Sequence, residues 1–193
     1  MDIEAKINFK GLENVVRAMS KKYQVKVGLL SSKGGADEVS DDMDVAGLGA
    51  LQEFGCDIKI TQKMAAYLHI KAKELGLQPS QGKGDGFVHI PARSWLQMPL
   101  ERRQDLKRKL IKYCGENQED IEYYIAKTGD LMSLAILIGT AAVEQIQEAF
   151  DTEGFGQWKP NSPLTMAQKG SAMPLVDKGK LSGAVTYEVN ENG

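Results

Sequence analysis

Alternating and helical spacings of apolar residues divide the chain into short strands and helices. Apolar side chains at every second position predict strands, and spacings of three and four predict helices. Glycines follow several of the predicted helices, as Gly55 and Gly76 do, which is typical of helix C-termini. In chain order we predict a strand at 3–9, a helix at 12–19, a strand at 23–29, helices at 45–54 and 61–75 with a brief strand at 58–60 before the second, a strand at 87–90, helices at 92–113, 120–150 and 164–168, and a final strand at 185–189.

These elements indicate a mixed fold. Strand, short helix and strand over the first 30 residues form a small α+β unit in which one face of a sheet is covered. The spacing from Leu131 onward is the clearest amphipathic helical pattern in the chain. We therefore predict the α+β class.

Three segments have the composition of extended mobile loops, at about 31–44, 76–86 and 154–180. The first holds five acidic residues and one lysine and has almost nothing to bury. The second is rich in glycine, and the third combines glycines and prolines with a single tryptophan, Trp158.

Length and charge narrow the class of protein. The chain has 193 residues, 24 Lys and Arg against 26 Asp and Glu, and a net charge of -2. This length predicts a single domain over 1–193. A near-neutral chain is unlike a dedicated nucleic-acid-binding domain, which is usually basic. The acidic start does not match a signal peptide, and the most apolar stretch, 131–138, is too short to cross a bilayer, so we expect no membrane association.

No local motif announces catalysis, a cofactor or a metal. Glycines at 82–86 are followed by a predicted strand, whereas a phosphate-binding loop leads into a helix. Residues 42–53 match a calcium loop in part, but Ala46 stands where an oxygen ligand is needed. His69 and His89 have no ligand at metal-binding spacing. We expect no catalytic, cofactor-binding or metal-binding residues, and no enzyme.

A basic stripe lies on the predicted helix between positions 101 and 112, with six basic and two acidic residues. It could contact phosphates, in which case binding would weaken with salt. Alternatively it is a solvated helix face supported by pairs such as Asp105 and Lys109. A third reading pairs it with an acidic patch on a neighbouring subunit, such as the 37–44 loop.

Trp158 stands in an irregular, glycine-rich segment. A tryptophan in such a place either folds back onto the core or serves as an anchor in a partner. The sequence leaves both alternatives open.

Several motifs together resemble the virion-morphogenesis (tail-completion) family of tailed bacteriophages and prophages. The most specific block runs from Trp158 to Leu181, and the resemblance covers roughly positions 22 to 189. Upstream, Ser94-Trp95 stands where the family usually has Pro-Phe. The motifs are Leu51-Gln52-Glu53-Phe54-Gly55, Ile90-Pro91-Ala92-Arg93-Ser94-Trp95-Leu96, Phe155-Gly156-Gln157-Trp158-x-Pro160-x-Ser162-Pro163 and Lys169-Gly170-Ser171-x-x-Pro174-Leu175-x-Asp177-x-Gly179-x-Leu181.

The resemblance implies a structural protein of the phage neck or tail end, with a small antiparallel sheet packed against long helices. It implies that copies form a ring around the DNA channel, that the partners are other copies and neck or tail proteins, and that DNA passes without sequence-specific binding. The protein would be made in the bacterial cytoplasm and reside in the virion. The alternative is a DNA-binding accessory protein that uses the 101–112 helix. The candidate assembly-interface residues are Arg93, Trp95, Trp158, Pro160, Leu164, Lys169, Asp177 and Leu181.

Overall fold

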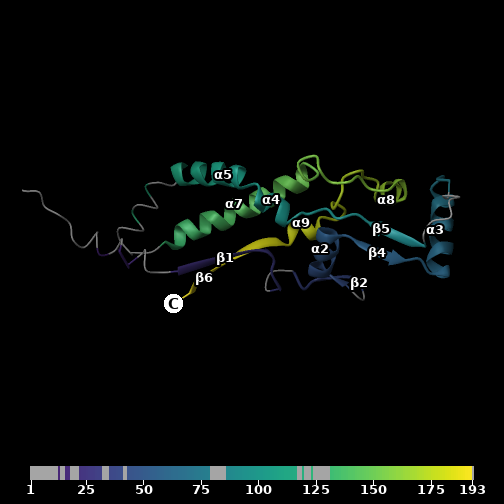
Figure 1. Ribbon diagram of the computed structural model, residues 1–193, viewed down its shortest axis with the longest axis horizontal. Coiled ribbons are helices and arrows are strands. Elements are labelled where there is room, and N and C mark those ends of the chain that lie inside the picture. The colour runs from purple at the N-terminus through teal and green to yellow at the C-terminus, as the bar shows by residue number, and fades with distance from the viewer. Residues whose placement is uncertain are drawn as a thin grey trace, which may run out of the picture. The chain divides into compact units, whose positions relative to one another are not determined.

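The computed structural model describes residues 13, 16–17, 22–31, 35–40, 43–78, 86–116, 119, 123 and 131–192. The predicted strand at 3–9, most of the helix at 12–19 and residues 79–85 of the loop predicted at about 76–86 lie outside these residues. The described elements are β1 (Lys22–Leu29), β2 (Glu38–Ser40), β3 (Met43–Asp44), α2 (Val45–Phe54), β4 (Cys56–Lys59), α3 (Gln62–Glu74), β5 (Phe87–Ile90), α4 (Gln97–Glu101), α5 (Arg103–Glu116), α7 (Met132–Asp151), α8 (Pro163–Lys169), α9 (Lys180–Gly183) and β6 (Val185–Asn192) (Figure 1).

Helices combined with small sheets confirm the predicted α+β class. The strands form three two-stranded sheets, β1 with β6, β2 with β3 and β4 with β5. The last two pairs are antiparallel. The chain divides into two compact units, one of residues 1–28, 102–145 and 186–193, the other of residues 29–101 and 146–185. The single domain over 1–193 stays a prediction.

In the first unit, two helices and a strand pair supply the packing. The N-terminal part of α7 approaches β6 so closely at Gly139 that a Cβ there would lie 2.3 Å from Cδ2 of Tyr187. Helix α5 meets the same helix through Glu144, which accepts a hydrogen bond from the Tyr113 hydroxyl and lies 3.5 Å from Nζ of Lys109. The close contact of Gly139 with β6 and the polar contacts of Glu144 with α5 therefore hold α7 in this unit.

In the second unit, α2 follows β3 and leads into β4. Asp44 caps α2 by accepting the N–H of Gly47 at 2.6 Å, and Gly55 ends the helix at a φ of 71°. The end of α7, residues 146–151, supplies Ile146, Ala149 and Phe150 to the interior. These side chains and Val45 are buried and belong to the core of the second unit.

Four elements differ from the prediction. The acid-rich 31–44 segment contains the short β2–β3 pair, because backbone pairing does not require apolar side chains. The helix predicted at 92–113 begins only at Gln97 and divides into α4 and α5. Helix α7 begins at Met132, and most of 117–130 lies outside the described residues. The one-turn helix α9 was not predicted.

Candidate functional site

Three aromatic rings form the centre of the second unit. Phe150 lies between Trp95 and Trp158, with ring centroids 6.1 Å and 5.7 Å away. Trp95 is 2% exposed and Trp158 is 8% exposed. Their indole N–H groups donate to the carbonyls of Gly49 at 2.8 Å and Ser94 at 3.1 Å. Both buried tryptophans therefore have their polar atom satisfied. Of the two alternatives for Trp158, the structure shows the fold onto the core.

Glu53 joins α2 to the segment that enters α4. Its side chain is buried, and each carboxylate oxygen accepts two hydrogen bonds. Oε1 accepts from the Ser94 hydroxyl at 2.6 Å and the Gln97 N–H at 3.1 Å. Oε2 accepts from the N–H groups of Trp95 at 2.7 Å and Leu96 at 2.9 Å. The carboxylate thus satisfies backbone donors at a helix start that have no helical carbonyl as partner.

Gly55, which follows this glutamate and Phe54, is required by the backbone. It has a φ of 71°, and a Cβ on it would lie 2.6 Å from the N of Ala92. Only a glycine combines this conformation with such close approach. The Glu-Phe-Gly motif therefore has a structural explanation: it brings the end of α2 against the segment that begins at Pro91.

Arg93 connects the same segment to the loop after Trp158. Its guanidinium donates to the carbonyls of Lys159 at 2.7 Å and Pro160 at 3.0 Å, and to Oδ1 of Asn161 at 3.3 Å. Asn161 in turn donates to the carbonyls of Ala172 and Met173. Burial lowers the pKa of Arg93 from its ordinary value. Arg93 and Asn161 together thereby connect three stretches of the unit that are apart in sequence.

Next to Arg93 lies a hollow of about 620 Å³, which we call the Arg93 hollow. Five of the eight predicted interface residues line it, from four separate stretches of the chain. Trp95 and Trp158 belong to the aromatic cluster instead, and Leu164 is half-buried on α8. The five lining residues are Arg93, Pro160, Lys169, Asp177 and Leu181. The structure therefore brings most of the predicted residues to one place, although Arg93 and Leu181 are buried and contact their own chain.

Sequence reasoning predicted the elements of what we call the arm, β4, α3 and β5, but missed that the two strands pair and that apolar side chains of the helix are exposed. Strands β4 and β5 pair from Cys56 opposite Ile90 to Lys59 opposite Phe87, and α3 connects them (Figure 1). Within α3, Tyr67 is 53% exposed and Ile70 is 55% exposed. That some apolar side chains of α3 are exposed could have been predicted from its sequence. The apolar residues are spread around the helix and form no single stripe, so one packed face cannot bury them all.

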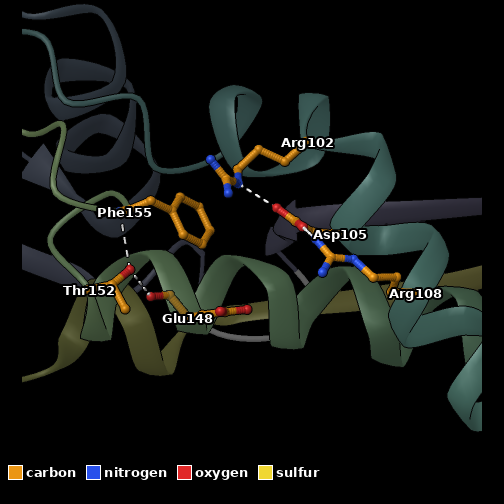
Figure 2. A network of polar contacts seen from close by, with 6 residues as sticks. All are labelled: Arg102, Asp105, Arg108, Glu148, Thr152 and Phe155. Atoms are coloured by element: carbon orange, nitrogen blue, oxygen red, sulfur yellow. Dashed lines mark hydrogen bonds and ion pairs between the residues drawn. The ribbon is translucent and has the colours of Figure 1, made fainter.

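The basic stripe lies on α5, in the first unit. Figure 2 shows Asp105 between Arg102, at 2.7 Å, and Arg108. Lys109 forms a further ion pair with Glu144. The pKa of Asp105 is lowered from its ordinary value: burial raises it, but the hydrogen bonds and charges of the two arginines outweigh burial. The second reading named the pair Asp105 and Lys109, but Asp105 pairs with the two arginines and Lys109 with Glu144 of α7. These pairs fit a solvated helix face, and the other two readings stay predictions.

Figure 2 also draws the end of α7, in the second unit. The Thr152 hydroxyl donates to the Glu148 carbonyl at 2.6 Å and accepts the Phe155 N–H at 3.1 Å. These two hydrogen bonds stabilise the chain where it leaves α7 and enters the glycine-rich turn before Trp158. In that turn Gly154 has a φ of 67°, and a Cβ there would lie 2.4 Å from Trp158.

Among the described residues, no group of three or more His, Cys, Asp or Glu side chains is placed to hold a metal ion. The described helices include none that is long and apolar enough to span a membrane. The chain matches no family model, no curated protein and no solved structure.

Proposed function

We propose that this chain is a structural assembly protein of a tailed phage or prophage, in which several copies form a ring around the DNA channel that joins head and tail or completes the tail. The motifs around Glu53, Arg93 and Trp158 support this proposal through their resemblance to the virion-morphogenesis family. The observation that carries it is the arm.

The arm has apolar side chains that the described part of the chain leaves exposed. Tyr67 and Ile70 are more than half exposed on α3, and Phe87 on β5 is 42% exposed. A two-stranded hairpin is marginally stable in water unless further elements cover it. Exposed apolar residues gathered on one small element are characteristic of a protein–protein contact. A neighbouring subunit would supply the missing cover.

The motif residues suit such an arm because they make its base rigid. Glu53 and Gly55 fix the end of α2 where β4 begins, and Arg93 fixes the chain just after β5 ends. Both ends of the arm therefore start from segments held by buried hydrogen bonds. A rigid base reduces the conformational entropy lost when the arm docks.

The charges of α5 fit a ring better than a DNA-binding surface. Asp105 and Glu144 form ion pairs with Arg108 and Lys109 of α5 and with Arg102 just before it, and the whole chain is close to neutral. Strong phosphate binding needs cations that are available to release counterions from DNA. A channel through which DNA slides benefits from weak attachment.

The test is deletion of the gene from an inducible phage or prophage that carries it, followed by electron microscopy of the lysate. We expect separate filled heads and tails if the protein joins them, or defective tails if it completes the tail. Expression of the wild-type chain in trans should restore infectious particles. Normal, infectious particles in the deletion lysate would refute the proposal.

The arm is tested in the same complementation assay. The double variant Tyr67→Ser/Ile70→Ser removes the apolar surface of α3 and should fail to restore infectivity. The matched control Lys63→Ser/Lys73→Ser changes two exposed lysines of the same helix and should complement. Equal complementation by both variants would remove the arm from the proposal.

A further inference from the structure

The Arg93 hollow holds an imbalance of charge. Two cations, Arg93 and Lys169, and one carboxylate, Asp177, line it, while His89 at its edge is paired with Asp57 at 2.6 Å. Arg93 is only 6% exposed and donates to neutral oxygens alone. Nζ of Lys169 donates to the carbonyl of Met173 at 2.9 Å. Neither cation forms an ion pair with a carboxylate of the described residues.

This imbalance is energetically unfavourable in the free chain. Burying a cation is costly unless an opposite charge accompanies it. Burial lowers the pKa of Lys169, Asp177 opposes that change, and the positive charge of Arg93 adds to it. Asp177 balances only one of the two cations, and an anion in the hollow would supply the second counter-charge, which the described residues do not provide.

We propose that the Arg93 hollow binds a carboxylate carried on an apolar-flanked segment of another protein chain. The walls account for the flanking apolar groups, since Val39, Leu48, Val88, Ile90, Leu175 and Leu181 line the same hollow. A volume of about 620 Å³ accommodates a few residues of extended peptide. This inference stands whether or not the protein belongs to a virion.

The charge count favours a carboxylate over a phosphate. Two cations and one carboxylate leave a single positive charge in excess, which a monoanion balances and a phosphate dianion exceeds. Arg93 is already held by three acceptors, so its guanidinium offers a bidentate contact to neither anion, and the charge count alone distinguishes the two. Lys169, which is half-buried, is the cation that the ligand would approach.

The test is a titration of the full-length ¹⁵N-labelled chain followed by NMR, with two capped peptides that differ in one group. Acetyl-Val-Glu-Val-amide carries the carboxylate, and acetyl-Val-Gln-Val-amide replaces it by a neutral amide. We expect the first to shift the Asn161 side-chain amide and the backbone around Lys169 saturably, and the second to bind about tenfold more weakly. Equal affinities, or no shift of these signals at about 10 mM peptide, would overturn the proposal.

Charge variants give effects of opposite sign. Lys169→Gln should weaken binding of the Glu peptide about fivefold, and Asp177→Asn should strengthen it about threefold, because each changes the excess charge by one. Lys178→Gln is the matched control, an exposed lysine that does not line the Arg93 hollow, and should leave the affinity within about twofold. Asp177 is exposed, so its replacement should leave the fold intact. Weakening by Asp177→Asn would contradict the proposal, and tighter binding of inorganic phosphate than of the Glu peptide would replace the carboxylate by a phosphate.

Discussion

Replacement of Glu53 by glutamine should destabilise the second unit although it changes the side chain by only one group. The carboxylate accepts four hydrogen bonds, two at each oxygen. An amide keeps one acceptor oxygen and turns the other position into a donor. The least costly arrangement keeps the oxygen on Trp95 and Leu96 and places the NH₂ group toward Ser94, whose hydroxyl can reverse its role. The N–H of Gln97 then has no acceptor.

The cost follows from these bonds. An unpartnered donor costs about 1–3 kcal/mol when it is buried, and because Gln97 is exposed, water offsets part of the loss and the cost is about 1 kcal/mol. The two bonds that remain lose the charge of their acceptor, which weakens each by about 1 kcal/mol, since hydrogen bonds to charged groups are worth about twice neutral ones. We therefore expect Glu53→Gln to lower the free energy of unfolding by about 3 kcal/mol.

Urea unfolding of the full chain, followed by tryptophan fluorescence, is the measurement. Both tryptophans of the chain, Trp95 and Trp158, lie in the second unit, so the signal reports on the part that is perturbed. Glu101→Gln is the matched control, because Glu101 is exposed and should cost less than about 0.5 kcal/mol. A loss below about 1 kcal/mol for Glu53→Gln would show that the four bonds do not hold α2 to α4.

Three further predictions concern the first unit. Gly139→Ala should gain about 1 kcal/mol of stability from helix propensity and lose up to about 3 kcal/mol through the clash with Tyr187. Thermal unfolding should therefore show a net loss of stability of about 2 kcal/mol. An increase in stability would contradict the close contact. The Tyr113 hydrogen bond, helped by Lys109, lowers the pKa of Glu144 although burial raises it. A carboxyl whose folded pKa is depressed stabilises above its ordinary pKa, so stability should fall as pH drops below about 4.3, and Glu144→Gln should flatten this acid slope; an unchanged slope would refute the assignment. Fluorescence anisotropy with a duplex of about 30 base pairs should show no tight, salt-dependent binding to α5, whereas micromolar affinity that falls steeply with salt would favour the DNA-binding alternative.

Helices and strands were predictable where the spacing of apolar residues and the residues at the ends of the element indicate the same bounds. The helix over 45–54 was predicted with the bounds of α2, because Gly55 marks its end. Thr61, at the start of the helix predicted over 61–75, caps α3 by accepting the N–H of Met64 at 3.2 Å. The strand over 87–90 was also predicted with its observed bounds.

The arrangement of these elements was not predictable from spacing. Arg93 bonds to residues 66 to 68 positions away, and no periodicity links such distant stretches. The family resemblance selected residues that the fold brings together, but it did not reveal that Trp95 and Trp158 are satisfied inside their own chain. The exposure of Tyr67 and Ile70 depends on what surrounds α3, which its own sequence does not state.

Quantitative mass spectrometry of purified phage particles is the measurement we would make first. A ring subunit should be present in a fixed number of copies greater than one per particle, far fewer than the major capsid protein, and should remain after nuclease treatment. Its absence from particles that are complete and infectious would contradict a structural role in the virion, and its loss on nuclease treatment would point to the DNA-binding alternative.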